Sequence, residues 1–332
     1  MTVVASDLRA KEEVQDLRSR IDAEIPSLVK DTSPAGLYDP VRYVLAGGGK
    51  RLRPILLLLS ARAFGALAEE ALPAALAVEV FHNFTLVHDD IMDHAEERRG
   101  RETVHVRWDQ STAILCGDYL MGLSYDLMAR TSTTRTAELI HHFQSMVARL
   151  CEGQTLDKEF ESRGEVTVDE YLHMVDCKTG ALLQTSLVLG GLIGGARAAD
   201  LETLRLIGFS VGRAFQIKDD LLDLTADDDR WGKTIGGDLI EGKKTYLLLR
   251  VLEKSAGSDL DWFSRIVEEG GLDSHLVPEA RERMERLGVL EEARNEVSQY
   301  SRDALEAVDR LPQSASVDTL SWLLMRMQER LH

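Results

Sequence analysis

The chain has 332 residues, of which 44% are hydrophobic and 29% are charged. This composition is that of a globular protein, and it excludes a mainly disordered, collagen-like or membrane-embedded chain. The net charge of −17 disfavours nucleic acid and anionic lipid surfaces as partners, so an anionic substrate would need a local basic pocket. The three cysteines lack metal-ligand spacing and no apolar segment opens the chain, which predicts a reducing, cytoplasmic location.

Helical periodicity runs through the whole sequence. Apolar residues recur at spacings of three and four in the segments 7–25, 73–87, 137–150, 201–224 and 290–311. No proline lies between Pro73 and Pro278, which favours long helices, and strand signals are nearly absent. The polar run 96–101 marks a break between helices. The apolar stretch 181–196 contains Gln184, Thr185 and four glycines, so we predict a buried helix there and no transmembrane segment.

The fold class that follows is all-α. We expect about ten or more helices in one domain over 1–332, because no segment has the composition of a linker and no repeat is evident.

The first chemical motif is basic. Residues 48–54 read Gly-Gly-Lys-Arg-Leu-Arg-Pro, which places Lys50, Arg51 and Arg53 directly after two glycines. Glycines let backbone amides approach an anion, and arginine can fork onto phosphate oxygens. The spacing of a Walker A loop is absent, so this motif indicates a different kind of anion site.

Two aspartate clusters share one spacing. Asp89, Asp90 and Asp93 end one apolar helical segment, and a second trio ends another; its members are Asp219, Asp220 and Asp223. Residues i and i+4 share a helix face, so each cluster presents a pair of like charges that calls for a cation. Carboxylates without His or Cys favour Mg²⁺, which in turn favours diphosphates. One such cluster alone could be a solvated acidic face; two of identical spacing favour a metal site.

Further cations follow each acidic cluster. Arg98 and Arg99 come after the first, Lys233 and Lys243 come after the second, and Lys178 precedes it. Each lysine singly reads as a solvated side chain. Together these residues outline two anion sites, one metal-dependent and one held by side chains alone.

These motifs, in this order, resemble the trans-isoprenyl diphosphate synthases, which condense isopentenyl diphosphate with allylic diphosphates. The resemblance spans most of the chain and rests on a set of ordered segments, namely 48–54, 79–82 leading into 89–93, 98–100, 153–157, 178–179, 215–223, 232–233 and 238–243. It implies an all-α bundle around a central cavity, a homodimer, and Mg²⁺ as cofactor, typically three ions.

The resemblance also implies roles for individual residues. Asp89, Asp93 and Asp219 would ligate Mg²⁺, supported directly or through water by Asp90, Asp220 and Asp223. The allylic diphosphate would be held by five residues: Arg98, Lys178, Gln216, Lys233 and Lys243. Isopentenyl diphosphate would be held without metal by Lys50, Arg53, His82 and Arg99. Catalytic roles would fall to Lys178, Thr179, Gln216 and Lys233. Taken alone, His82 reads as a core histidine, and Thr179 and Gln216 read as ordinary helix polar groups.

The reaction implied is an ionisation followed by a condensation. Charge growing on the leaving allylic diphosphate would be stabilised, an allyl cation would form, and the double bond of isopentenyl diphosphate would attack it. Proton loss would complete an extension by five carbons.

In the resembled family, the residues just before the first acidic cluster form the floor of the tunnel in which the product grows, so the resemblance lets product length be predicted from them. Phe84 lies five residues before Asp89, about 7.5 Å along a helix, and can close the tunnel in which the product grows. Thr85, one position nearer, is small. We therefore predict geranylgeranyl diphosphate, with farnesyl diphosphate as the alternative product. Phe84 could instead be a core aromatic without a gating role.

Two rival functions deserve comparison. A class I terpene cyclase also ionises a diphosphate with an aspartate-rich helix, but its second metal motif normally carries Asn, Ser or Thr, and Glu, and the basic motif at 48–54 would have no purpose. A catalytically silent regulatory subunit would tend to lose an acidic cluster or a diphosphate-binding lysine, and neither is missing here.

Overall fold

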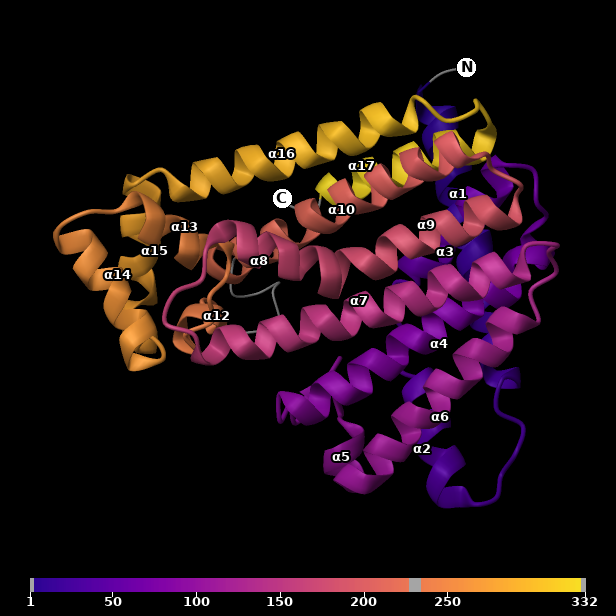
Figure 1. The fold of residues 1–332 in the computed structure, drawn as a ribbon, viewed down its shortest axis with the longest axis horizontal. Coiled ribbons are helices and arrows are strands. Elements are labelled where there is room, and N and C mark those ends of the chain that lie inside the picture. The colour runs from indigo at the N-terminus through magenta and orange to yellow at the C-terminus, as the bar shows by residue number, and fades with distance from the viewer. Residues whose placement is uncertain (1–2, 227–233, 330–332) are drawn as a thin grey trace. The chain divides into compact units, whose positions relative to one another are not determined.

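The computed structural model describes residues 3–226 and 234–329, with side chains described for 6–226 and 234–327 (Figure 1). Within these ranges the chain forms sixteen α-helices, α1 to α10 and α12 to α17, and one antiparallel pair of two-residue strands. The prediction of an all-α protein is confirmed.

The chain divides into two compact units, each made of separate stretches of sequence. Unit 1 comprises Met1–Gln144, Thr185–Leu204 and Leu311–Leu323. Unit 2 comprises Ser145–Gln184, Arg205–Arg310 and Leu324–His332.

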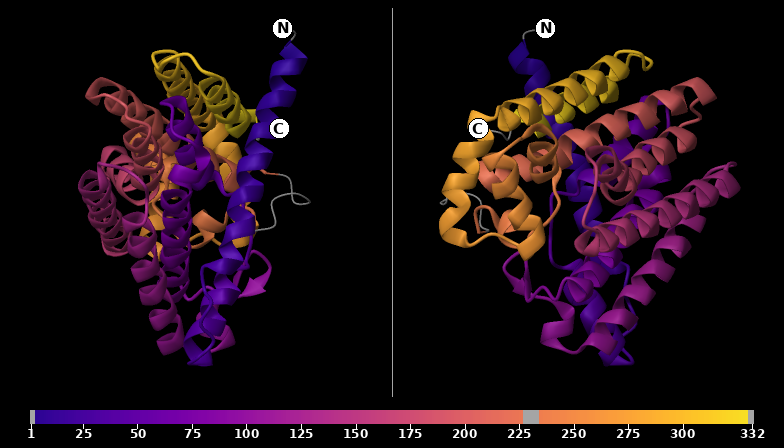
Figure 2. Two further views of the ribbon diagram at one scale, coloured as in Figure 1. Left: turned by 90° about the vertical axis from the view of Figure 1, so that its right-hand side faces the viewer. Right: turned by 60° about the vertical axis from the view of Figure 1, so that its left-hand side comes forward.

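Unit 1 carries the N-terminal elements. They are α1 (Val3–Glu24), η1 (Ile25–Ser27), α2 (Ala35–Leu45), α3 (Leu52–Ala63), α4 (Ala68–Met92), β1 (Glu97–Arg98), β2 (Arg101–Glu102), α5 (Val104–Arg107) and α6 (Gln110–Ala129). Helix α4 packs against α3 on one side and against α6 on another, and α4 and α6 lie side by side in Figures 1 and 2. Helix α3 is apolar nearly all round, with Ile55–Leu59 fully or almost fully buried, so it forms the centre of this core.

Unit 2 is built mainly from the later elements. They are most of α7 (Thr136–Ser162), α8 (Val168–Val175), the π-helix η2 (Asp176–Gly180), most of α10 (Ala198–Thr225), α12 (Gly237–Ile240), α13 (Tyr246–Lys254), α14 (Ser258–Glu269), η3 (Ser274–Leu276), α15 (Val277–Arg286) and α16 (Val289–Val308). Its hydrophobic core joins α8, the end of α10, α13 and α16 around residues such as Leu248 and Phe263.

The predicted helices are all present, and the structure extends most of them. Segment 73–87 is the middle of α4, segment 137–150 is the first half of α7, and segment 201–224 is nearly all of α10. The stretch 181–196 becomes α9 (Ala181–Ile193), whose apolar residues are almost all buried. The last helix, α17, spans Ala315–Glu329. No helix in the described ranges is both long and apolar enough to cross a membrane.

The polar run 96–101 forms more structure than a simple break between helices. Glu97 pairs with Glu102 and Arg98 with Arg101 in a small hairpin that follows α4. Arg99 and Gly100 both have positive φ at its turn, which is the geometry of a tight two-residue connection.

Candidate active site

The basic motif forms a tight loop that enters α3. Gly48 and Gly49 have φ values of +70° and +145°, and Arg51 itself is left-handed at +52°. The Arg51 side chain is buried, where its Nε donates to Asp22 at 2.8 Å and its Nη1 donates to Glu79. Desolvation opposes its charge, but the two carboxylates outweigh that effect and raise the pKa of Arg51. Arg51 therefore anchors the loop to α1 and α4, while Lys50 next to it is exposed.

Two of the predicted side chains of the metal-free anion site meet beside this loop, one from the first turn of α3 and one from α4. An Arg53 Nη1 lies 3.3 Å from His82 Nε2. Burial and the nearby charges of Arg53 and Arg99 hold the pKa of His82 well below its ordinary value, so the imidazole is neutral and its Nε2 accepts the arginine hydrogen. The Nε of Arg53 is buried and has no hydrogen-bond partner among the described residues. A cation that holds a buried donor without a partner is a feature that a bound anion would satisfy.

Arg99 closes the same region from the hairpin. Its guanidinium donates to the Gly48 carbonyl, and a Cβ on Gly49 would lie 3.0 Å from its Nη1. Desolvation is the largest cause of its lowered pKa. The structure thus brings together Arg53, His82 and Arg99, three of the four residues predicted for isopentenyl diphosphate, with Lys50 on the same loop.

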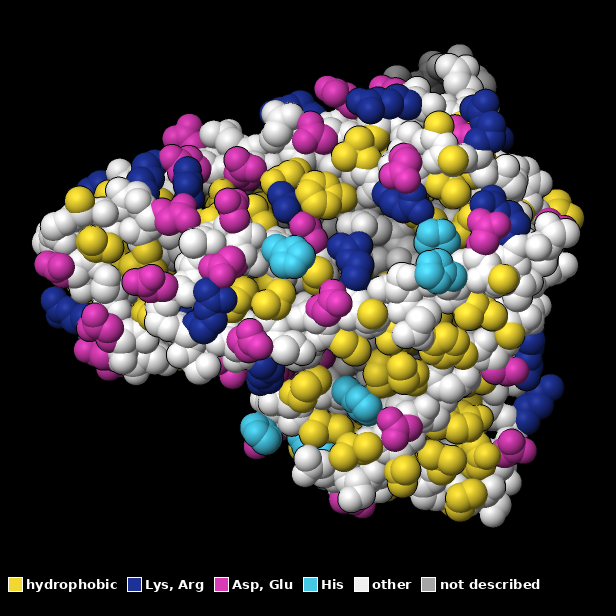
Figure 3. Space-filling model, in the orientation of Figure 1, with side chains coloured by type: hydrophobic (Ala, Val, Ile, Leu, Met, Phe, Trp, Pro, Cys, Tyr) yellow, Lys and Arg dark blue, Asp and Glu magenta, His cyan; other side chains and the backbone are white. Residues whose placement is uncertain are grey.

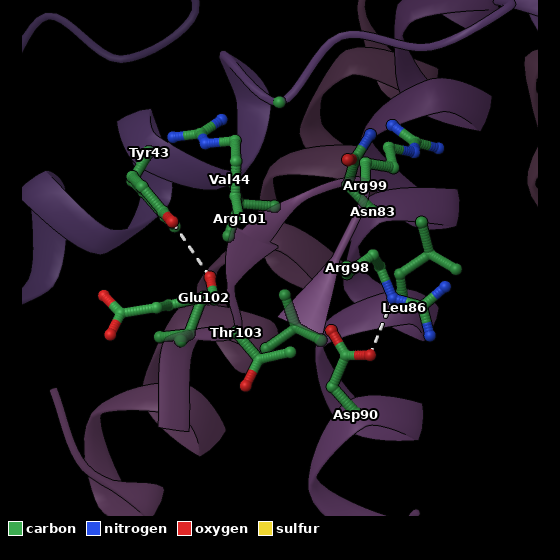
Figure 4. Close-up of a pocket in the computed structure, with 13 residues that line it drawn as sticks. Tyr43, Val44, Asn83, Leu86, Asp90, Arg98, Arg99, Arg101, Glu102 and Thr103 are labelled. Carbon is green, nitrogen blue, oxygen red and sulfur yellow. Dashed lines mark hydrogen bonds and ion pairs between the residues drawn. The ribbon is translucent and has the colours of Figure 1, made fainter. Parts of the chain in front are cut away.

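A pocket lies beside this group, between the hairpin and the ends of α2 and α4 (Figure 4). Arg98, Arg99 and Arg101 line it from the hairpin, over an apolar wall that includes Val44 and Leu86. Arg98 Nε donates to Asp90 Oδ1 at 2.6 Å, and the Arg101 guanidinium stacks 3.8 Å from the centre of the Tyr43 ring. Arg101 was not anticipated from the sequence.

The first acidic cluster lies at the end of α4. Asp89 is half-buried, and Asp93, the residue that ends the helix, is exposed. Asp90 is buried and turned toward the hairpin, where burial raises its pKa against the opposing charge of Arg98. The i,i+4 pair and the middle aspartate therefore have different surroundings.

The predicted gate residues lie just over a turn before Asp89. The Phe84 ring is partly buried and lies 5.2 Å from the Phe81 ring and 4.8 Å from the His88 ring, centre to centre. Thr85 is buried, and its hydroxyl donates to the His82 carbonyl at 2.8 Å. Both positions are on α4, which also carries Asp89 and ends directly before Asp93.

The second acidic cluster, in unit 2, repeats this division. Asp219 and Asp223 are half-buried, while Asp220 is 3% exposed. Asp220 accepts hydrogen bonds from the Tyr171 hydroxyl at 2.6 Å, from Gln216 Nε2 at 3.1 Å and from the Tyr246 backbone amide at 3.1 Å. Burial outweighs these donors and raises the pKa of Asp220 to about 7.

Lys178 and Thr179 lie in the π-helix η2, a kind of distortion that is frequent at functional sites. Lys178 Nζ pairs with Asp157 of α7, and the Thr179 hydroxyl donates to Gln216 Oε1 at 3.1 Å. A Cβ on Gly153 would lie 2.4 Å from the Lys178 backbone nitrogen, so this glycine permits the close approach of α7. Three of the predicted diphosphate and catalytic residues thus gather in unit 2.

Helix η2 is fixed by a network that the sequence did not reveal. Arg213 makes two hydrogen bonds to the Asp176 carboxylate, at 2.9 and 2.8 Å, and a third to the Tyr300 hydroxyl at 2.8 Å. Residues 37 or more apart in sequence, without a motif, give no signal of such pairing.

Two predicted lysines remain to be placed. Lys243 forms an exposed ion pair with Glu241, with Nζ and Oε2 2.6 Å apart. Lys233 lies outside the described residues.

The donor chemistry is compatible with Mg²⁺. Among the described residues no three His, Cys, Asp or Glu side chains are grouped closely enough to form a metal site by themselves. Each acidic cluster instead offers two accessible carboxylates at i,i+4 spacing, and Mg²⁺ is commonly bound by one or two carboxylates together with waters and substrate phosphates.

A family model described as polyprenyl synthetase matches residues 34–284, which include every one of these motifs. The chain belongs to the polyprenyl synthetase family. The resemblance seen in the sequence is confirmed.

Among similar family members, the geranylgeranyl diphosphate synthase of Methanosarcina mazei is 38% identical over 302 residues, covering 90% of this chain and 91% of that protein. The geranylfarnesyl diphosphate synthase of Natronomonas pharaonis is 34% identical and covers 96% of both chains. The crystal structure of the geranylgeranyl pyrophosphate synthetase of Pyrococcus horikoshii superposes with a TM-score of 0.90 at 35% identity, covering 96% of this chain and 99% of that one.

Proposed function

We propose that this polyprenyl synthetase family member is a Mg²⁺-dependent trans-prenyltransferase that condenses isopentenyl diphosphate with allylic diphosphates. The observation that carries the proposal is the cation group of unit 1, in which Arg53 and Arg99 lie around a neutral, half-buried His82 and the buried Nε of Arg53 has no hydrogen-bond partner among the described residues. A second anion site of this kind suits an enzyme with two diphosphate substrates and has no purpose in a terpene cyclase.

In this proposal Lys50, Arg53, His82 and Arg99 hold isopentenyl diphosphate without metal. The neutral His82 acts by accepting one arginine hydrogen, which orients the Arg53 guanidinium so that its remaining donors can face the diphosphate. Charge-assisted hydrogen bonds of this type contribute about 1.5–3 kcal/mol each.

The acidic clusters serve the allylic substrate. Asp89, Asp93 and Asp219 would hold Mg²⁺, with Asp90, Asp220 and Asp223 in support. Mg²⁺, when bound, would supply neutralisation of the charge that develops on the leaving diphosphate.

Five further residues serve the allylic diphosphate. Arg98, Lys178, Lys233 and Lys243 add positive charge around it, and Gln216 orients it together with Thr179. The predicted catalytic roles of Lys178, Thr179, Gln216 and Lys233 are part of this proposal. Breaking the allylic carbon–oxygen bond leaves a cation, the double bond of isopentenyl diphosphate forms the new carbon–carbon bond, and the proton released passes to the departed diphosphate.

The product proposed is geranylgeranyl diphosphate. Phe84 on α4 is large and partly buried, and Thr85 one residue nearer the metal residues is small. Names of similar proteins support the C20 product, since the M. mazei and P. horikoshii proteins are called geranylgeranyl diphosphate synthases.

We further propose one synthase domain acting as a homodimer in the cytoplasm. On α6, Ile114 and Leu115 are 42% and 59% exposed, and apolar side chains gather over that part of unit 1 in Figure 3. A second copy of the chain would cover this apolar face. The three cysteines are free thiols, which is compatible with a reducing compartment.

The decisive experiment incubates the purified protein with Mg²⁺, isopentenyl diphosphate and each allylic diphosphate from C5 to C20, and sizes the dephosphorylated products. Prenyl alcohols ending at C20 are expected, and chelation of Mg²⁺ should abolish them. Pyrophosphate release from an allylic substrate alone would instead identify a cyclase, and no turnover of either kind would identify a silent subunit.

A further inference from the structure

The middle aspartate of the second cluster lies in a chain of hydrogen bonds that runs through unit 2. The Thr179 hydroxyl donates to Gln216 Oε1, Gln216 Nε2 donates to Asp220 Oδ1, and the Tyr171 hydroxyl donates to Asp220 Oδ2. The backbone amide of Tyr246 is a second donor to Oδ2. Both carboxylate oxygens of Asp220 are therefore engaged by protein donors.

Helical geometry separates Asp220 from its neighbours in the cluster. Successive residues of an α-helix are rotated by about 100°, so Asp220 lies at one edge of the face that carries Asp219 and Asp223. Asp220 is buried where α10 meets two other helices. Its contact on α8 is Tyr171, and its contact at the start of α13 is Tyr246. Its contacts fix the rotation of α10 about its own axis.

The Tyr171 side chain is itself rigidly held. It is 3% exposed in the core of unit 2, and its helix begins with a capping box in which Thr167 and Glu170 each bond the other's backbone amide. Its hydroxyl therefore marks a fixed point to which α10 is attached.

We propose that Tyr171 is a positioning residue for the allylic diphosphate site. It acts through Asp220, which fixes the amide of Gln216 and the direction in which Asp219 and Asp223 face. The chain of bonds also reaches Thr179 in the π-helix beside Lys178. This inference rests on the proposed function for the roles of Gln216 and Lys178, and it adds a residue to which neither motif nor family resemblance assigned a task.

The test compares Tyr171→Phe with Tyr246→Phe. The first removes the hydroxyl that bonds Asp220 and keeps the ring. The second removes a hydroxyl from the same buried cluster, but Asp220 is bonded there by the backbone amide, which the substitution keeps. Tyr246→Phe is thus the matched control, and we expect its kinetic constants to stay within about twofold of wild type.

For Tyr171→Phe we expect the KM for the allylic substrate to rise about tenfold or kcat to fall by as much, while the KM for isopentenyl diphosphate is unchanged. Titration calorimetry with Mg²⁺ and inorganic pyrophosphate should show a matching loss of affinity. Because Tyr171 acts through Asp220, the double variant Tyr171→Phe/Asp220→Asn should bind pyrophosphate no more weakly than Asp220→Asn alone.

Equal behaviour of the two tyrosine variants, or additive effects in the double variant, would overturn the proposal. If Tyr171→Phe does not fold, Asp220→Asn takes its place in the calorimetry, and an unchanged pyrophosphate affinity would count against the network. Absence of prenyl transfer by the wild-type protein would refute the proposed function, whereas the calorimetric comparison judges the positioning role separately.

Discussion

At the scale of single residues, His82 shows how a neutral group can complete a cationic site. Its half-buried imidazole lies among arginines, so protonation would add a further positive charge to a group that has already lost much of its solvation. A lysine or arginine at this position would repel Arg53 and Arg99. A histidine with a lowered pKa supplies an acceptor without that charge.

This arrangement predicts a pH dependence of stability. The unfolded chain protonates His82 near pH 6.5, whereas the folded chain resists protonation, so stability is lost as pH falls below 6.5. At pH 5.5 the loss from this residue is at most about 1.4 kcal/mol relative to pH 7.5. Urea unfolding of wild type and His82→Gln at both pH values checks this, and an identical pH dependence of the two proteins would contradict it.

Phe84 gives a prediction about product length. Phe84→Ala removes a ring that lies between Phe81 and His88, so we expect products at least one five-carbon unit longer than wild type. Thr85→Phe places bulk one residue nearer Asp89, and we expect a shift toward C15. Sizing of the prenyl alcohols compares the product lengths of the two variants with wild type. A product distribution that neither substitution alters would rule out the gate.

At the scale of elements, α3 and its entry loop depend on buried contacts that tie them to α1, α4 and α9. Arg51→Met would leave Glu79, whose side chain is 4% exposed, without its partner in the core. Breaking a buried ion pair in this way costs about 3–5 kcal/mol. Urea unfolding should show this loss, and adding Glu79→Gln should restore part of it. Arg18→Met, which affects an exposed pair with Asp22, is the control and should change stability by less than about 1 kcal/mol.

Helix α9 approaches α3 through Gly190. A Cβ at this position would lie 2.2 Å from the Leu57 carbonyl oxygen, and backbone cannot move aside as a side chain can. We expect Gly190→Ala to lower the free energy of unfolding by about 1–3 kcal/mol or more. Gly36 on α2 has no atom within 4 Å of an added Cβ, so Gly36→Ala should instead raise it by up to about 0.5–1 kcal/mol. Thermal unfolding of both variants compares them, and a stable Gly190→Ala protein would show that α9 can shift.

Helix existence and type could be predicted because each long helix repeats its apolar residues at helical spacing. Both acidic clusters and the basic loop could be located as well, because their residues are adjacent in sequence. The π-helix could not, since it depends on Gly153 admitting α7 and on Arg213 holding Asp176. The different surroundings of Asp90 and Asp220 within their clusters also required knowledge of the helices that pack beside them.

At the scale of the whole molecule, the proposed homodimer predicts a concentration-dependent mass. Leu115→Glu introduces a charge into the apolar face of α6, where burial against a second copy would be costly. Light scattering of the eluted protein should show a dimer for wild type and a monomer for this variant. Leu67→Glu, at a residue that is 64% exposed but lies outside α6, should remain dimeric. A monomeric wild-type protein would contradict the proposal that a second copy of the chain covers the apolar face of α6.

Helix α4 carries His82, Phe84 and Asp89 at a rise of about 1.5 Å per residue, and Asp93 follows its last residue directly. If the floor of the tunnel and groups that bind the substrates share one helix, the position of a bulky residue along that helix sets the distance between the floor and the binding groups. Moving a bulky side chain by one position then resets the length of the product and leaves the binding groups where they were. Product length is thus open to change by single substitutions. This sensitivity to single substitutions offers a physical reason why proteins similar to this chain include synthases named for both C20 and C25 products.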